Sequence, residues 1–201
     1  YPALIMTNSL TDNYLQRFGG IARLYGQDGL AALSQAHFFV IGLGGVGSWV
    51  AEALARSGIG EISLMDMDDI CITNTNRQLP ATQSQIGHSK VEALSKRLLD
   101  INPEITIHCI EDFLDTENLK DYIGRQHDFV IDAIDATNVK SATAAYCSAI
   151  KVPLITIGSA GGKSDPRMVT SDDLNRTTND PMLGKVRQQL YKKHNFSRDK
   201  N

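Results

Sequence analysis

Residues 37–48 read HFFVIGLGGVGS, a short apolar run followed directly by a glycine-rich segment. The run His37–Ile41 has the length and composition of a buried strand. Gly42, Gly44 and Gly47 have the spacing G-x-G-x-x-G, and a helical pattern begins after them. This order of strand, glycine loop and helix is typical of the βαβ unit that binds nucleotides in α/β proteins.

Short apolar runs alternate with helical patterns along most of the chain. A second strand is predicted at residues 61–65, and others at 105–110, 129–131 and 154–157. Helices are predicted after the glycine loop, at residues 89–101 and between the last two strands. Because strands separated by helices pair in parallel, we predict a doubly wound α/β fold with a mainly parallel sheet. The packed face of the first helix is expected to contain Val46, Val50, Ala53, Leu54 and Ser57, and that of the last Val139, Ala142, Ala145, Tyr146 and Ala149.

The predicted sheet divides the chain into three parts. Residues 1–36 form an N-terminal helical segment whose pattern is interrupted by several glycines. Residues 37–165 form the nucleotide-binding domain, which ends in the stretch GSAGGKSD. After Pro166 the pattern becomes irregular and the last residues are polar. We interpret residues 166–201 as the start of an additional C-terminal part.

The composition is that of an ordinary globular protein, with 42% hydrophobic and 21% charged residues among 201. No apolar run approaches the ~18 residues of a membrane span. Three cysteines without C-x-x-C spacing argue against a disulfide framework and a usual zinc site, so a cytoplasmic protein is expected. The net charge is −3, yet basic residues are concentrated after Met182. Such a basic end either contacts a polyanion or is a solvated surface, and the sequence leaves both open.

The glycine loop and the strand after it predict how a nucleotide is held. Gly42 allows a tight turn, Gly44 lets the backbone approach a phosphate closely, and Gly47 lets the helix pack against the strand. The helix N-terminus adds free N–H groups and roughly half a positive charge. Asp66, at the end of the second strand, is expected to accept hydrogen bonds from a ribose.

Two cations beyond the second strand indicate which nucleotide binds. Lys90 stands at the predicted start of a helix, where a positive charge opposes the helix dipole, so we expect it to hold an anion. Arg77 could pair with phosphate oxygens through its forked guanidinium. Either cation alone could be a plain surface charge. Together with the glycine loop they suit a triphosphate better than the dinucleotide of a nicotinamide oxidoreductase.

Asp132 and Asp135 lie in the stretch FVIDAIDA, at the carboxyl end of another predicted strand. Ligands of open α/β sheets bind beyond these ends, and Mg²⁺ prefers one or two carboxylates together with nucleotide phosphates. We expect Asp135 to hold Mg²⁺ and Asp132 to support it. The alternative is that one of the two only caps the following helix.

The remaining reactive residue types have structural interpretations. Cys109 and Cys147 are predicted to be small buried side chains in a strand and a helix. Cys71 follows the second strand near the predicted site, so a reactive role stays open for it. The five histidines show no metal-ligand spacing, and His88 is interpreted as a loop residue although it lies near Lys90.

The stretches GLGGVGS, LMDMDDICITNTNRQ, IGHSK and VIDAIDA together resemble the adenylating family that includes the ubiquitin-activating enzymes and the activators of thiamine and molybdopterin sulfur-carrier proteins. The resemblance covers most of the chain. It implies that ATP and Mg²⁺ bind, with Asp135 at the magnesium position and catalytic roles for Arg77 and Lys90. The ATP-binding positions that it implies are Gly42, Gly44, Gly45, Asp66, Asn74, Arg77, Gln78, Lys90 and Asp135.

Within this family, the stretches QRFGGIARLYG, TNTNRQ, INPE and GSAGGKSDP are similar to the tRNA threonylcarbamoyladenosine dehydratases. That similarity implies ATP-dependent adenylation of the threonyl carboxylate, followed by intramolecular ring closure with net loss of water. The alternative is adenylation of the C-terminal carboxylate of a ubiquitin-like sulfur-carrier protein. It is disfavoured because no cysteine follows Cys147, so the zinc-binding C-x-x-C pairs of those activators are missing.

The resemblance also implies partners. A tRNA would be the substrate, and a cysteine desulfurase system is a further candidate partner for sulfur transfer. Family members are homodimers, so residues 1–36 are expected to contact a second subunit and to send Arg17 or Arg23 to its phosphates. Arg17 and Asp135 are placed among the catalytic residues, and Gly47 among the cofactor-binding residues. The dehydratases continue past Asn201, which makes residues 166–201 the expected start of a substrate-binding part.

Overall fold

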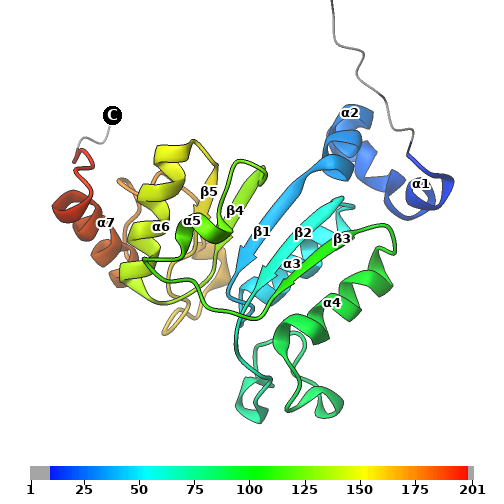
Figure 1. The fold of residues 1–201 in the computed structure, drawn as a ribbon, viewed down its shortest axis with the longest axis horizontal. Helices are drawn as coiled ribbons and strands as arrows, with labels where there is room; N and C mark the ends of the chain where they lie inside the picture. Colours follow the sequence, from blue (N-terminus) through cyan, green and yellow to red (C-terminus); the bar gives the residue numbers. More distant parts are fainter. Residues whose placement is uncertain (1–9, 199–201) are drawn as a thin grey trace, which may run out of the picture.

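The computed structural model describes residues 10–198. Its centre is a sheet of parallel strands in the order β3-β2-β1-β4-β5 (Figure 1). This confirms the doubly wound α/β fold. Strand order reverses between β1 and β4, so a crevice opens beyond the carboxyl ends of these two strands. The strands are β1 (His37–Ile41), β2 (Glu61–Met65), β3 (Thr106–Ile110), β4 (Phe129–Asp132) and β5 (Leu154–Thr156).

Helices cover both faces of the sheet. On one face α3 (Gly47–Arg56) and α4 (Lys90–Ile101) enclose a core that includes Val40, Leu64 and Leu94. On the other face α5 (Leu119–Tyr122) and α6 (Thr137–Ile150) pack over β1 and β4. Short 3-10 turns η2 (Ile72–Asn74) and η3 (Gln83–Gln85) lie in the long segment between β2 and α4.

The packed face of α3 differs from the predicted one. The helix buries Ser48, Ala51, Glu52 and Ala55, whereas Ala53 is exposed. The cause is Gly47, which lies directly against the carbonyl of Gly42 and so fixes the rotation of the helix about its axis. Residues spaced by four from Gly47 therefore face the sheet. Val50 and Leu54 lie at the border of the core, and Val46 precedes the helix.

In α6 the prediction is correct for Val139 and Ala142 but wrong for Ala149, which is exposed. Ala145 and Tyr146 are half-buried. The helix instead buries Lys140 and Thr143, because Lys140 forms an ion pair with the end of β4. A purely apolar pattern could not indicate this face.

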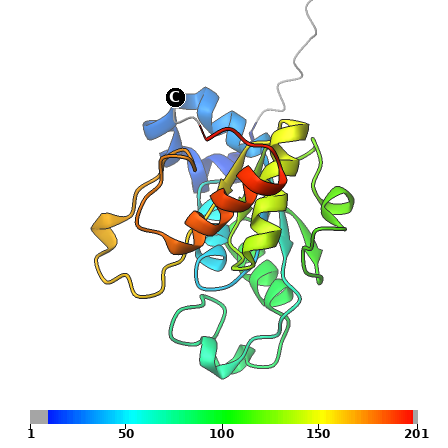
Figure 2. The ribbon, with the colours of Figure 1, turned by 90° about the vertical axis from the view of Figure 1, so that its left-hand side faces the viewer.

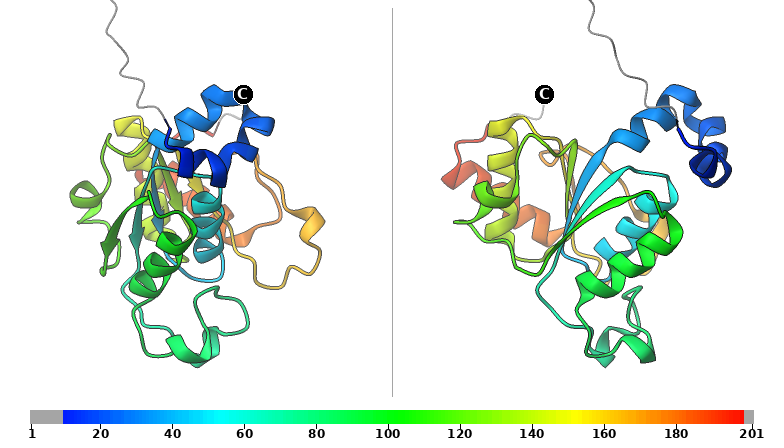
Figure 3. Two further views of the ribbon diagram at one scale, coloured as in Figure 1. Left: turned by 90° about the vertical axis from the view of Figure 1, so that its right-hand side faces the viewer. Right: turned by 45° about the vertical axis from the view of Figure 1, so that its right-hand side comes forward.

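The described part of the N-terminal segment, residues 10–36, is helical in pieces, as predicted, and residues 1–9 of that segment lie outside the described residues. It consists of α1 (Asp12–Phe18), the 3-10 turn η1 (Gly19–Ile21) and α2 (Ala22–Gln35), which is interrupted at Gly26 with a φ of 76°. Gly29 lies within the helix and does not break it. Figure 3 shows these helices at one end of the molecule and the segment between β2 and α4 at the other. The side chains of Thr11 and Asn13 donate hydrogen bonds to Glu104 and hold α1 to the body of the protein.

The predicted C-terminal part is more regular over residues 166–198 than its sequence suggests, and residues 199–201 lie outside the described residues. The 3-10 turn η4 (Pro166–Met168) is followed by α7 (Pro181–Lys193), which lies beside α6 (Figure 2). Leu183, Val186 and Leu190 of α7 are buried. Charged and polar residues lie between these positions, so the average hydrophobicity of this stretch is low. For this reason the sequence pattern does not predict the helix. No helix within residues 10–198 combines the length and apolar character needed to cross a bilayer.

Candidate functional site

A cavity of about 1260 Å³ lies beyond the carboxyl ends of the strands. Five separate segments contribute most of its lining: the glycine loop, the segment after β2, residues 112–115 after β3, the loop after β4 and the stretch at 158–161. The structure therefore brings together most of the predicted site residues, although they are distributed over much of the chain. The predicted residues that line the cavity are Gly42, Gly44, Gly45, Asp66, Asn74, Arg77, Gln78, Lys90 and Asp135.

The glycine loop has the geometry that its sequence predicts. Gly42 has a φ of 85°, which a residue with a side chain rarely adopts. A Cβ atom on Gly44 would meet only the amide nitrogen of Gln78, at 3.9 Å, so a ligand can approach the backbone here. Gly47 does not line the cavity, and a Cβ atom at this position would lie 1.8 Å from the carbonyl oxygen of Gly42. Gly47 thus acts through helix packing and not through ligand contact.

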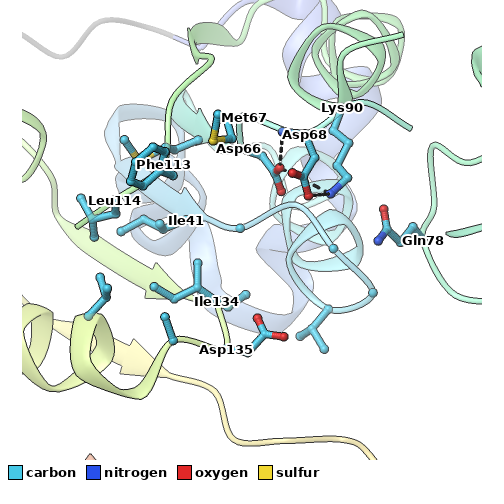
Figure 4. Close-up of a pocket in the computed structure, with 18 of the residues that line it drawn as sticks. Ile41, Asp66, Met67, Asp68, Gln78, Lys90, Phe113, Leu114, Ile134 and Asp135 are labelled. Carbon is cyan, nitrogen blue, oxygen red and sulfur yellow. Dashed lines mark hydrogen bonds and ion pairs between the residues drawn. The ribbon is translucent and has the colours of Figure 1, made fainter. Parts of the chain in front are cut away.

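Asp66, Asp68 and Lys90 form an ion-paired group on one side of the glycine loop (Figure 4). The Nζ atom of Lys90 lies 2.7 Å from Oδ2 of Asp68 and 3.4 Å from Oδ1 of Asp66. Lys90 is only 4% exposed, whereas the Asp68 side chain is 67% exposed. The two carboxylates explain how a cation is tolerated at the start of α4. The protein itself thus supplies a counter-charge for Lys90, and the contact of Lys90 with a bound anion stays a prediction.

Sequence reasoning did not assign a role to Asp68. The acidic run after β2 contained the signal, since a buried lysine needs a nearby carboxylate. Asp66 has a second function, because its Oδ2 atom accepts a hydrogen bond from the backbone N–H of Leu43 at 2.7 Å. This contact ties the end of β2 to the glycine loop. An incoming phosphate could exchange places with the exposed carboxylate of Asp68 while Lys90 keeps its contact with Asp66.

Arg77 is exposed, and its guanidinium donates hydrogen bonds to the carbonyl of Thr73 and the side chain of Asn76. No carboxylate of residues 10–198 forms an ion pair with it, so its charge is available to an anion in the cavity. The Arg77 backbone is held as well, because the indole N–H of Trp49 donates to its carbonyl oxygen at 2.9 Å. The loop that carries Arg77 is thus attached to the first turn of α3.

Gln78 is 7% exposed, and its Oε1 atom is buried without a hydrogen-bond partner. Burying an amide oxygen without a partner costs about 1–3 kcal/mol. A donor group of a ligand or a water molecule in the cavity would relieve that cost. The unpartnered oxygen of Gln78 is therefore a structural reason for this side chain to contact a ligand. This reason could not be obtained from the sequence alone.

The structure gives different surroundings to Asp132, the last residue of β4, and Asp135 in the loop after it. Asp132 is fully buried, with its Oδ1 atom 3.0 Å from Nζ of Lys140 and its Oδ2 atom accepting a hydrogen bond from Thr156. Burial raises the pKa of Asp132, and the Lys140 charge opposes this shift. Asp135 is exposed in the cavity and forms no hydrogen bond or ion pair with the described part of the chain. Of these two aspartates, Asp135 is the one whose carboxylate oxygens are open to the cavity and to a metal ion.

One wall of the cavity is apolar. Ile41, Met67, Phe113, Leu114 and Ile134 lie on the same side of the cavity in Figure 4. Phe113 and Leu114 follow β3 and are not among the site residues predicted from the sequence. They could have been found by applying the same rule, that ligands lie beyond the carboxyl ends of strands, to this strand too. An apolar wall beside a phosphate-binding loop suits the flat ring of a nucleobase.

The cysteines differ from one another. Cys147 is buried as predicted, and burial raises the pKa of its thiol to about 11. Cys109 is exposed, so its predicted burial is wrong; β3 is an edge strand, which leaves part of it uncovered. Cys71 is exposed and lines the cavity. Hydrogen bonds from Thr73 lower the pKa of the Cys71 thiol.

Arg17 and Arg23 do not reach this cavity. Arg17 lies on α1 and Arg23 on α2, beside the amino end of β1 (Figure 1). Neither residue is among those that line the cavity, which lies beyond the carboxyl ends of the strands. A single chain therefore does not bring these arginines to its own site.

The fold and this cavity define a nucleotide-binding protein of the adenylating type, and the chain belongs to the ThiF family, whose pattern matches residues 19–200. This confirms the resemblance seen in the sequence. The tRNA threonylcarbamoyladenosine dehydratase of Haemophilus influenzae is 57% identical over 188 residues, which are 94% of this chain and 72% of that protein. The enzyme of the same name from Escherichia coli is 47% identical over 185 residues, 92% of this chain and 69% of that protein. The crystal structure of the E. coli dehydratase TcdA in complex with ATP matches with a TM-score of 0.91 at 46% identity, covering 93% of this chain and 77% of that one.

Proposed function

We propose that this protein is an ATP-dependent tRNA threonylcarbamoyladenosine dehydratase. The observation that carries the proposal is the convergence of the glycine loop, the Lys90 group, Arg77 and Asp135 on one cavity. The chain that forms this cavity is 57% identical to a protein named as such a dehydratase. The activator of a sulfur-carrier protein, the alternative, is less well supported because no cysteine follows Cys147.

ATP would bind with its phosphates against the backbone of Gly44 and Gly45, where added Cβ atoms would reduce the space. Arg77 and Lys90 would neutralise charge on the phosphate oxygens as pyrophosphate leaves. Asp66 would accept a hydrogen bond from the ribose through the carboxylate that also holds the glycine loop. The apolar wall around Phe113 would receive the base.

Mg²⁺ fits the residues present. The exposed carboxylate of Asp135 points into the cavity, while Asp132 is occupied by Lys140 and Thr156. We therefore assign Asp135 as the protein ligand and Asp132 as its support through the loop between them. When bound there, Mg²⁺ would supply positive charge to phosphate oxygens.

The reaction would proceed in two steps. An oxygen of the threonyl carboxylate attacks the α-phosphorus of ATP, the bond to pyrophosphate breaks, and an acyl adenylate forms. A ureido nitrogen of the same threonylcarbamoyl group then attacks the activated carbonyl, loses its proton and releases AMP. The ring closes with net loss of one water. Because the second step is intramolecular, its effective molarity is high and no nucleophile of the protein is required.

The assembly is also part of the proposal. Arg17 and Arg23 are exposed, and Leu24 and Tyr25 of α2 are more than half exposed, so this end of the molecule offers apolar surface for a second subunit. In a homodimer, Arg17 or Arg23 of one subunit would reach the phosphates bound by the other. The basic residues of α7 would favour the tRNA. A cytoplasmic location suits a tRNA substrate, and a sulfur-transfer partner stays a prediction of the resemblance alone.

The decisive experiment is mass spectrometry of nucleosides after tRNA that carries threonylcarbamoyladenosine is incubated with the protein and ATP. We expect the modified nucleoside to lose the mass of one water, with AMP and pyrophosphate released. A sample without ATP is the control. An unchanged nucleoside, together with carrier-protein-dependent exchange of pyrophosphate into ATP, would contradict the proposal and favour the alternative.

A further inference from the structure

A second group of polar side chains lies at the opposite end of the sheet from the cavity. His37 is the first residue of β1, Glu61 is the first residue of β2, and His108 lies in β3. Parallel pairing places His37 beside Glu61, and Ser63 beside His108. Because side chains alternate along a strand, all four project from the same face of the sheet. The side chains of Glu61 and His108 are 37% and 48% exposed, so solvent reaches this group.

The potential ligand atoms are close together. Oε1 of Glu61 lies 3.5 Å from Nδ1 of His37 and 2.6 Å from Nε2 of His108. All three atoms lie within 4.8 Å of one another. A tetrahedral zinc ion has ligands at about 2.0–2.2 Å, which places the ligand atoms roughly 3.3–3.5 Å apart. The observed spacing reaches this range if the exposed His108 side chain turns slightly away from Glu61.

The residues around His37 hold its ring in an orientation that suits a metal ligand. Its Nε2 atom is 2.9 Å from the hydroxyl oxygen of Ser63, to which it can donate. That tautomer leaves the lone pair of Nδ1 facing Glu61. The backbone N–H of His37 donates to Asp128 at 2.8 Å, and the ring of His127 packs edge-on against that of His37 at 4.5 Å. Metal-binding histidines are commonly held in this way by a hydrogen bond at the other ring nitrogen.

We propose that His37, Glu61 and His108 form a binding site for a divalent transition-metal ion of the zinc type, with a remaining position open to water. Two imidazole nitrogens and one carboxylate oxygen match this class, whereas Mg²⁺ and Ca²⁺ prefer oxygen ligands throughout. Glu61 and Asp128 contribute the negative charge that a divalent cation needs. The sequence showed no metal spacing because the three ligands come from three different strands.

This site is distinct from the position proposed for Mg²⁺ at Asp135. β1 runs from His37 to Ile41 with the glycine loop beyond it, and strands rise about 3.3 Å per residue, so the two ends of β1 are well separated. Binding at His37 therefore requires neither ATP nor Asp135. The proposal can be tested, and can fail, independently of the proposed dehydratase activity.

The test is titration of the chelator-treated protein with Co²⁺, followed by visible absorption, and with Zn²⁺, followed by calorimetry. A background with Cys71→Ser and Cys109→Ser removes the two exposed thiols, which could bind either ion. We expect one ion per chain, and affinities at least ~10-fold lower in His108→Ala and in Glu61→Gln. Circular dichroism checks that both variants are folded.

Two matched variants complete the test. His194→Ala removes a histidine outside the group, and Asp135→Asn removes the carboxylate at the other end of the sheet. Both should bind Zn²⁺ as the parent does. The proposal is overturned if the parent binds no Co²⁺, if His108→Ala retains full affinity, or if Asp135→Asn abolishes binding.

Discussion

Lys90 is held by two carboxylates, only one of which also supports the glycine loop. Replacing it should leave the fold intact, because the Asp68 side chain can turn toward solvent, but it should remove a preformed positive charge from the cavity. We expect Lys90→Ala and Arg77→Ala each to lower kcat/KM for ATP by about 10²–10³, equivalent to roughly 3–4 kcal/mol of transition-state stabilisation. Turnover of ATP and thermal melting are the measurements.

The matched control for this prediction is Lys96→Ala. Lys96 lies on the same helix, but its side chain is 71% exposed and forms an ion pair with the exposed Glu92. This variant should turn over ATP at the rate of the unmodified protein. Turnover at the unmodified rate in both Lys90→Ala and Arg77→Ala would show that the cavity is not the ATP site.

Glu52 is a buried carboxylate of α3 that binds Arg97 of α4 and Arg56. The hydrogen bond from Arg97 lowers the pKa of Glu52 below its usual value of 4.5. A carboxyl group with a lowered pKa in the folded state adds stability above its usual pKa, and this stability is lost as the pH falls through the folded pKa. Because both arginines are about half exposed, we expect Glu52→Gln to cost about 1 kcal/mol at pH 7.

The difference between Glu52→Gln and the unmodified protein should disappear as the pH falls through the lowered pKa of Glu52, because Glu52 is then itself protonated. Denaturant titrations at several pH values measure it. The exposed residue Glu92, which pairs with Lys96, provides the comparison, and Glu92→Gln should change stability little at any pH. A difference that stays constant with pH would mean that the ion pair is not the cause.

At the scale of elements, the glycine loop needs small residues for two different reasons, helix packing at Gly47 and ligand approach at Gly44. Single substitutions can test the two reasons separately. A methyl group on Gly47 would collide with the Gly42 carbonyl, so Gly47→Ala should push α3 away from β1 and cost about 3 kcal/mol, the upper end of the usual cost of overpacking. Gly44 has open space in the cavity, so Gly44→Ala should fold normally and bind ATP at least ~10-fold more weakly. Thermal melting and calorimetric titration with ATP test the pair. A stable Gly47→Ala variant would contradict the packing role.

The elements that could be predicted from the sequence are those with a local signal. Strands β1 and β2 and helix α4 follow from runs of residues that are near in sequence, and the glycine motif fixes the first loop. The face of α3 could not be predicted, because it depends on the contact between Gly47 and Gly42. Lys140 in α6 was missed for a similar reason, since its burial makes sense only beside Asp132.

At the scale of the whole molecule, Asp180 connects the C-terminal helix to the cavity. It caps α7 by accepting a hydrogen bond from Leu183, and its other oxygen accepts from Ser159 and Lys163. Ser159 lines the cavity. We expect Asp180→Ala to cost about 1–2 kcal/mol as a lost helix cap and to speed amide hydrogen exchange at residues 158–163.

The control for Asp180→Ala is Asp172→Ala, which breaks an exposed ion pair with Arg176 in the same part of the chain. Hydrogen exchange followed by mass spectrometry should show no change at residues 158–163 in that variant. If Asp180→Ala left exchange there unaltered, α7 would not be coupled to the cavity. Three buried residues of α7 are enough to hold this helix in place, because α6 supplies the rest of the interface. So few apolar positions give only a weak helical pattern in the sequence.

The hydrogen bond between Trp49 and the carbonyl of Arg77 has an optical consequence. Trp49 is the single tryptophan of the chain, it is half exposed, and it touches the loop that carries an expected phosphate ligand. Indole emission responds to polarity and to nearby quenching groups, so movement of that loop should change the intensity or colour of the fluorescence. The single tryptophan thus serves as an intrinsic fluorescent probe, and stopped-flow mixing with ATP should give a change in Trp49 emission if the Arg77 loop moves when ATP binds.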